Sequence, residues 1–133
     1  MTFSFSFFSQ EKTRKNDNIK NKKIIHCFTG NKIEAKKFLE NDFYFGITGW
    51  ICDEKRNTDL IEALKIIPIE KLLIETDAPY LTPHPHRGER NEPFYTTFVS
   101  SKMAELLEIS DDEIQKITTN NAKKLFKEFS NLC

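Results

Sequence analysis

The chain has 133 residues, of which 38% are hydrophobic, and its 20 Lys and Arg residues balance 20 Asp and Glu residues. This is the size of one domain with one apolar core, and no apolar run reaches the ~20 residues that a membrane-spanning helix needs. The zero net charge excludes binding of nucleic acid through bulk charge, so only a local site would hold it. Three cysteines, none in a C-x-x-C pair, argue against a disulfide scaffold or a thiolate zinc site and favour the cytoplasm, or the nucleus in a eukaryote.

The first 23 residues differ in composition from the rest. They hold six basic and two acidic residues, a net charge of +4, which leaves −4 for residues 24–133. The alternation of Phe with Ser or Thr over residues 1–8 is typical of a strand, and the polar stretch 10–23 is typical of a solvated linker. We therefore predict a leader over 1–23 that is disordered or extended, and a domain over 24–133.

Short apolar runs alternate with amphipathic segments after residue 23. The runs predict strands at 24–28, 43–48 and 71–75. Asn31 is placed to cap a helix after the first strand, and a second helix opens at Asn57 or Thr58. Near-continuous apolar strands that alternate with helices are typical of a parallel sheet covered on both faces, so the predicted fold class is α/β.

A long irregular loop follows the third predicted strand, over residues 77–92. Loops of this length inside a compact domain are usually functional. Pro93 suits the first turn of a helix that runs to about Glu108, and Asn91 or Glu92 is the expected cap of that helix.

Two further caps follow toward the end of the chain. Ser110 opens a capping box, which predicts a short helix. Thr118 or Thr119 is the expected cap of a separate last helix.

Two polar residues stand at the carboxyl ends of predicted strands, where parallel sheets place their reactive groups: His26 and Asp77. Alternation puts His26 and Phe28 on one face of the first strand and Cys27 on the other, toward the helices. It gives Glu75 and Asp77 a common face. A neutral imidazole and a carboxylate at one mouth can coordinate a divalent metal. The alternative is an interior hydrogen-bonded histidine and a carboxylate that caps a turn.

Four sequence strings in this order resemble the TatD family of metal-dependent deoxyribonucleases, whose fold is the amidohydrolase-like (β/α)8 barrel. The resemblance runs from about Lys23 to Phe126. The strings are IHCFTG at 25–30, FGITGW at 45–50, LIETDAPYLTP at 73–83 and RGERNEP at 87–93. The resemblance implies that this chain is the carboxyl-terminal part of such a barrel, about strands six to eight with their helices.

The resemblance also implies roles for the two strand-end residues. His26 would be a metal ligand, and Asp77 would ligate metal and handle the proton of the attacking water. A complete family site holds two divalent cations, Mg²⁺, Mn²⁺ or Zn²⁺, and hydrolyses single-stranded DNA from its 3′ end. Glu75, one layer below Asp77, is expected to support the ligands through a hydrogen bond rather than to bind metal itself.

Five further residues are candidates for contact with the DNA substrate. Arg87 and Arg90 can clamp a phosphate, or form surface salt bridges with Glu89 or Glu92. Trp50 and Tyr80 can stack on a base, or cover the rim of the barrel. Asn91 is the fifth, because its expected helix amino terminus lies near the mouth of the site.

The pair His84 and His86 mimics a metal-binding His-x-His motif. Because it lies in the proline-rich loop, we interpret both histidines as loop residues near the substrate.

The match also lacks parts of the family pattern. Nothing before residue 24 resembles the family's His-x-His pair on the first strand, its Glu on the fourth or its His on the fifth. Two ligands are too few for a dinuclear site. The alternatives to an active enzyme are a non-catalytic half-barrel module, which a second chain would complete, and a fragment that arises from a wrong gene prediction.

Overall fold

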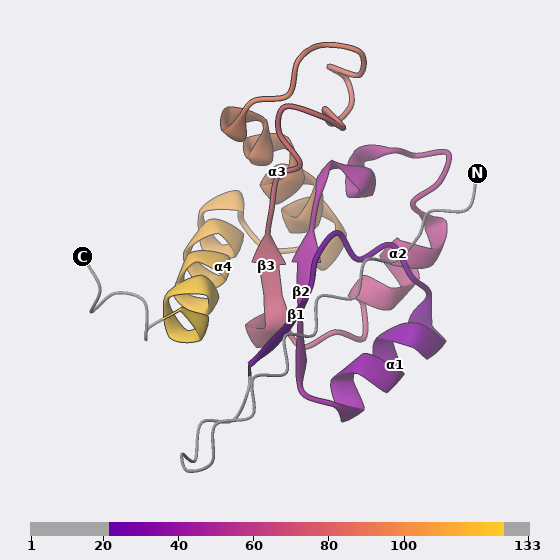
Figure 1. Ribbon diagram of the computed structural model, residues 1–133, viewed down its shortest axis with the longest axis vertical. Coiled ribbons are helices and arrows are strands. Elements are labelled where there is room, and N and C mark those ends of the chain that lie inside the picture. The colour runs from indigo at the N-terminus through magenta and orange to yellow at the C-terminus, as the bar shows by residue number, and fades with distance from the viewer. Residues whose placement is uncertain (1–21, 127–133) are drawn as a thin grey trace, which may run out of the picture.

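A computed structural model of the chain describes residues 22–126, and their core is a parallel sheet of three strands (Figure 1). The strands are β1 (Lys23–Ile25), β2 (Phe43–Ile47) and β3 (Leu72–Ile74), in the order β1-β2-β3. Phe45 of β2 lies opposite Ile25 on one side and Leu72 on the other. The predicted parallel α/β sheet is therefore confirmed. The predicted leader falls almost wholly outside the described residues.

Two helices cover one face of this sheet: α1 (Lys32–Glu40) and α2 (Thr58–Leu64), at the lower right of Figure 1. Asn31 caps α1 as predicted, because its side chain accepts hydrogen bonds from Ile33 N and Glu34 N while the Glu34 side chain bonds back to Asn31 N. Asn57 precedes α2, but its side chain donates to Ile51 O over 2.7 Å instead of capping the helix.

Short 3-10 turns join the sheet to the rest of the domain. They are η1 (Gly49–Cys52), η2 (Ile69–Lys71) and η3 (Pro93–Tyr95). Pro93 therefore begins a single 3-10 turn, and α3 (Thr96–Leu107) follows it directly. Glu92 stands at the cap position with no side-chain cap hydrogen bond, so neither Asn91 nor Glu92 caps in the predicted way.

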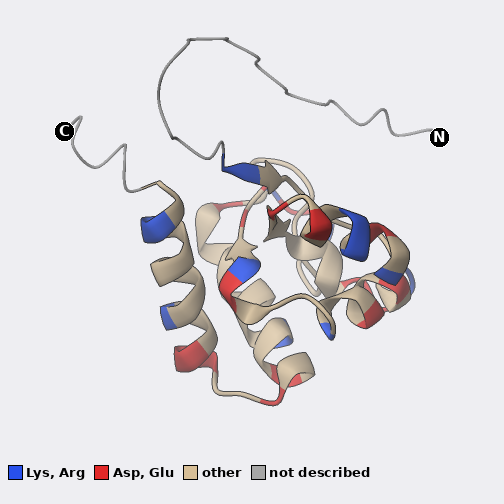
Figure 2. Cartoon of the chain, turned by 90° about the horizontal axis from the view of Figure 1, so that it is seen from below, with Lys and Arg blue, Asp and Glu red and all other residues tan. Residues whose placement is uncertain are grey.

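The end of the described chain is one helix, α4 (Asp111–Leu125), where two were predicted. Ser110 caps it, because its side chain accepts from Glu113 N. Thr118 lies inside the helix, where its hydroxyl donates to Ile114 O over 2.9 Å, so the local bond that suggested a cap is made within a continuous helix. Acidic residues occupy the first turn of α4 and Lys123 and Lys124 the last, as the helix dipole favours (Figure 2).

The core lies between the sheet and the helices. Its fully buried side chains include Phe45, Ile47, Leu60 and Met103. The ring of Phe28 meets that of Phe45 edge-on, with centroids 5.0 Å apart, and truncation of a buried Phe to Ala typically costs about 3–5 kcal/mol. Among residues 22–126, no helix has the length and apolar character needed to cross a membrane.

Candidate metal centre

His26 and Asp77 are neighbours at the carboxyl ends of the strands, as the sequence predicted. His26 follows β1, and its Nε2 lies 2.7 Å from Oδ1 of Asp77, which lies beyond β3. The other ring nitrogen, Nδ1, lies 2.7 Å from Oε2 of Glu75. The imidazole therefore bridges two carboxylates that come from the same extended segment.

The turn after β1 explains how His26 reaches these carboxylates. Cys27 has a φ of 51°, in the left-handed region, so strict alternation ends at Ile25. His26 consequently faces Glu75 and Asp77, while Phe28 is buried in the core against Phe45. The prediction that His26 and Phe28 share a strand face was wrong, because the strand is shorter than the apolar run.

Glu75 is held in place by groups around it. Its Oε2 accepts a hydrogen bond from Cys27 N over 3.2 Å as well as contacting His26 Nδ1. Its backbone N–H donates to Ile47 O over 2.9 Å. A β-carbon at Gly46 would overlap the Glu75 carboxylate, so only glycine leaves the carboxylate this space. Sequence reasoning missed Gly46, although a glycine inside a strand is a known sign of close approach.

Two carboxylates set the charge state of His26. Partial burial lowers the pKa of His26, but the hydrogen bond with Glu75 and the charges of Glu75 and Asp77 outweigh burial and raise it above its usual value. Each ring nitrogen lies beside a carboxylate oxygen, so the two acidic groups favour positive charge at this position, which is the charge that a metal cation would supply.

The second carboxylate oxygen of Asp77 is suited to bind a cation. Its Oδ2 is buried and has no hydrogen-bond partner among residues 22–126, which is an unfavourable state for a carboxylate oxygen unless a cation or another donor satisfies it. Within residues 22–126, no group of three His, Cys, Asp or Glu side chains is arranged to hold a metal ion. His26 and Asp77 by themselves offer two ligand groups, which is fewer than a closed metal site needs.

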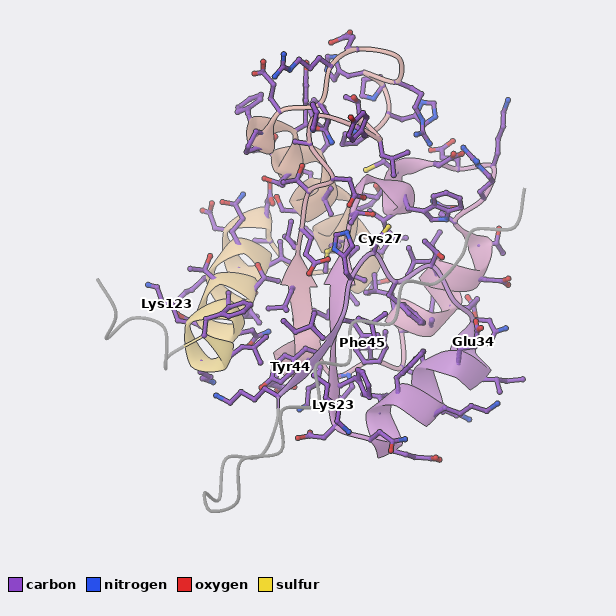
Figure 3. All side chains as sticks on the ribbon, in the orientation of Figure 1. Lys23, Cys27, Glu34, Tyr44, Phe45 and Lys123 are labelled. Carbon is purple, nitrogen blue, oxygen red and sulfur yellow. The ribbon has the colours of Figure 1, made fainter. Side chains whose placement is uncertain are left out.

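Cys27 faces this site, contrary to the prediction that it points toward the helices. Its Sγ lies 3.1 Å from Oγ1 of Thr48, and it lies at the upper end of β1 in Figure 3, well above Lys23. Burial raises the pKa of the Cys27 thiol to about 11. The thiol is therefore protonated at neutral pH in the metal-free protein.

Arg87 is tied to the residue that follows η1. Its Nη2 lies 3.1 Å from Oδ2 of Asp53, a buried carboxylate that also pairs with Arg56 over 2.6 Å. Neither of the expected salt-bridge partners, Glu89 and Glu92, is the partner of Arg87. The pair joins the loop after β3 to the segment after β2.

Asn91 closes the long loop on itself. Its Nδ2 donates to Tyr80 O over 2.6 Å, and its backbone N–H donates to Pro79 O over 3.0 Å. The Asn91 side chain is buried, and its Oδ1 has no hydrogen-bond partner in the described part of the chain. Asn91 thus fixes the turn that begins at Asp77, since Tyr80 N donates to Asp77 O over 2.8 Å.

The other three candidates differ in exposure. Trp50 is partly buried, its Nε1 donates to Arg56 O, and the Arg56 guanidinium lies 4.7 Å from its ring centroid. Tyr80 is 74% exposed, and Arg90 is also exposed. The structure thus leaves Tyr80 and Arg90 open to a ligand, whereas one face of Trp50 is covered.

His86 is a loop residue, as interpreted from the sequence. Its ring stacks on Tyr95 with centroids 4.8 Å apart, and its Nδ1 lies 3.2 Å from both carboxylate oxygens of Glu89. Tyr95 donates its hydroxyl to Glu89 over 3.0 Å. These contacts fasten the loop 77–92, at the top of Figure 1, to the start of α3.

Comparison with known proteins agrees with this fold. A family profile described as "TatD related DNase" matches residues 8–127. The chain is 46% identical over 104 residues to YabD of Bacillus subtilis, described as an uncharacterized metal-dependent hydrolase. It is 45% identical over 107 residues to the "3'-5' ssDNA/RNA exonuclease TatD" of Citrobacter rodentium. These alignments cover 78% and 77% of this chain and 40% and 41% of the relatives.

Solved structures show the same likeness. YJJV, a TatD homologue from Escherichia coli, has a TM-score of 0.71 at 29% identity, covering 78% of this chain and 40% of that protein. A TatD family hydrolase from Entamoeba histolytica has a TM-score of 0.69 at 25% identity, covering 78% and 42%. The fold is that of the TatD-type α/β proteins. The chain belongs to the TatD related DNase family, and it spans about two fifths of the length of the relatives it matches.

Proposed function

We propose that this chain contributes to metal-dependent hydrolysis of phosphodiester bonds in single-stranded DNA, from the 3′ end. The observation that carries the proposal is the contact of His26 with Asp77, together with the unsatisfied oxygen of Asp77. The names of the relatives, a metal-dependent hydrolase and a 3'-5' ssDNA/RNA exonuclease, support the reaction class. We also propose that β1, β2 and β3 correspond to the sixth to eighth strands of the family barrel.

His26 and Asp77 would hold a divalent cation, Mg²⁺, Mn²⁺ or Zn²⁺, as part of a site for two cations. When bound, the cations supply Lewis acidity toward a phosphate oxygen and toward the attacking water. Glu75 would accept a hydrogen bond from His26 Nδ1–H and so leave Nε2 free to face the shared site. Asp77 supplies the carboxylate that accepts a proton from the attacking water. Further ligands would come from outside residues 22–126, from more of the same protein or from a second chain.

The loop 77–92 would bind the strand that is cleaved. Arg90 is exposed, and the guanidinium of Arg87 is held in one orientation by Asp53, so both can contact phosphates. Tyr80 offers an exposed ring to a base, and Asn91 fixes the turn that carries Tyr80. Trp50 would contribute through its uncovered face.

The test is digestion of a 5′-labelled single-stranded oligonucleotide with Mg²⁺ or Mn²⁺. We expect the wild-type protein to shorten the label-bearing strand in steps from the 3′ end, and Asp77→Asn and EDTA to abolish this. Asp112→Asn is the matched control, because Asp112 is an exposed carboxylate in the first turn of α4. Equal digestion by wild type and Asp77→Asn would contradict the catalytic role of Asp77.

One observation favours a second function, that of a non-catalytic module. The described residues offer no group of three metal-ligating side chains. Such a module would bind no stoichiometric metal, so elemental analysis of the protein purified without chelator distinguishes the two functions.

A further inference from the structure

Three exposed apolar side chains lie in the loop that follows Asp77 or directly after its end. Within residues 22–126, the large hydrophobic side chains that are exposed include Tyr80 at 74%, Leu81 at 49% and Phe94 at 70%. We name these three residues the loop patch. Single exposed apolar residues are ordinary on protein surfaces, but several in one loop beside a candidate site are a candidate binding surface.

Backbone contacts connect the loop patch to the candidate metal centre. Tyr80 N donates to Asp77 O over 2.8 Å, so Tyr80 belongs to the turn that starts at Asp77. Asn91 bonds to Tyr80 O and to Pro79 O, and Phe94 follows Asn91 by three residues. Asn91 therefore fixes the backbone of Tyr80 to a point three residues before Phe94.

The rings of the loop patch are free to accept a planar partner. Among the described residues, the ring contact of Phe94 is with its neighbour Tyr95 alone, tilted by 58° at a centroid distance of 6.1 Å. Tyr80 has no ring contact within that part of the chain. The neighbouring aromatic residues Tyr95 and Phe98 differ from these two, because their rings pack on His86.

The surroundings of the loop patch indicate the chemistry of its partner. Arg90 lies in the same loop, is exposed, and forms no ion pair among the described residues, so it can contact a phosphate. Stacking on an aromatic ring needs an unpaired base, because bases within a duplex already stack on each other. A strand with one phosphate at Asp77 and its base on the neighbouring turn satisfies both requirements.

We propose that Phe94, together with Tyr80, forms a stacking platform for an unpaired base of the nucleic-acid strand whose phosphodiester lies at His26 and Asp77. This inference rests on the proposed function and adds Phe94 to its binding residues. It makes the recognition of the strand dependent on the presence of bases but tolerant of their sequence, since every base has a flat aromatic face.

The experiment compares two fluorescein-labelled strands of ten units, both with phosphorothioate linkages that resist hydrolysis. One is oligo(dT), and the other carries abasic tetrahydrofuran units with the same number of charges. Binding of the full chain is measured by fluorescence anisotropy with Mg²⁺ present. We expect Phe94→Ala and Tyr80→Ala each to weaken oligo(dT) binding about tenfold and to leave binding of the abasic strand unchanged. Phe94→Trp should retain or strengthen oligo(dT) binding.

Ile33→Ala is the matched control, because Ile33 is a large apolar residue on α1 with 66% exposure. It should bind both strands as the wild type does. If Phe94→Ala changes the two strands alike, or changes neither, the stacking platform is wrong while the proposed function stands. If the wild type binds neither strand, the proposed function is wrong and the inference falls with it. If Phe94→Ala converts a dimer to a monomer in sedimentation, the loop patch is a contact between copies and the inference is overturned.

Discussion

The carboxylate of Glu75 lies over the α-carbon of Gly46, in the space that any side chain at position 46 would occupy. From there it contacts His26 Nδ1 and accepts from Cys27 N. The absence of a side chain at Gly46, in the middle strand, thus lets Glu75, which follows β3, orient His26, which follows β1. The site is built from all three strands.

Gly46→Ala should therefore destabilise the domain. The added methyl group displaces a carboxylate that is held by two contacts, and such overpacking typically costs about 1–3 kcal/mol. Urea unfolding followed by circular dichroism measures the loss. In a Glu75→Ala background the same substitution should cost clearly less, because the displaced group is absent. An equal loss of unfolding free energy in both backgrounds would show that the absence of a side chain at Gly46 does not serve to accommodate Glu75.

Asp53→Asn should weaken the anchorage of the loop 77–92. Asp53 is buried and pairs with both Arg56 and Arg87, so loss of its charge leaves these partners poorly satisfied, at about 1–3 kcal/mol. Thermal unfolding at pH 7 measures the effect. Glu54→Gln is the control, since Glu54 is the exposed acidic neighbour. Equal melting temperatures for wild type and Asp53→Asn would contradict the claim that Asp53 anchors the loop 77–92.

The same carboxylate predicts a pH dependence. Burial raises the pKa of Asp53, but hydrogen bonds from Arg56 and Arg87 outweigh burial and hold the pKa below its ordinary value. The stabilisation is therefore fully present above the unfolded-state pKa of about 4 and is lost as the pH falls through the lower folded-state pKa. The difference in stability between wild type and Asp53→Asn should be constant from pH 7 to 5 and shrink below pH 4. A difference that grows on acidification would have the wrong sign.

Asn121→Ala should destabilise the contact between α4 and the sheet. Asn121 is buried, and its Nδ2 donates to Ile69 O over 2.8 Å and to Leu72 O over 2.9 Å. Removing the amide leaves two carbonyls without this donor, at about 1–3 kcal/mol. Asn120→Ala, at an exposed neighbouring position of the same helix, should change stability little. Equal effects at the two positions in chemical denaturation would mean that the α4 contact is not as described.

Local patterns in the sequence predicted the elements that depend on local physics. The three apolar runs became the parallel strands, and Asn31 and Ser110 cap their helices because a cap needs only a few neighbouring residues. The adjacency of His26 and Asp77 followed from a general property of parallel sheets, that their carboxyl ends lie on one edge.

Relations that depend on tertiary structure could not be predicted in this way. The partner of Arg87 is Asp53, 34 residues earlier, whereas sequence reasoning considered only near neighbours. Alternation misplaced Cys27 because its φ of 51° turns the chain. The prediction of a cap at Thr118 was wrong because a threonine whose hydroxyl bonds backwards within a helix looks the same in sequence as one that caps.

The most direct test of the account is Mn²⁺ binding to the full chain, measured by electron paramagnetic resonance of the free ion. We expect the wild type and Asp112→Asn to bind Mn²⁺ with equal affinity. We expect His26→Ala and Asp77→Asn each to weaken Mn²⁺ binding by about tenfold or more, as loss of a ligand or its support typically does. Unchanged binding in both variants, or no binding by the wild type, would contradict the claim that His26 and Asp77 share a cation.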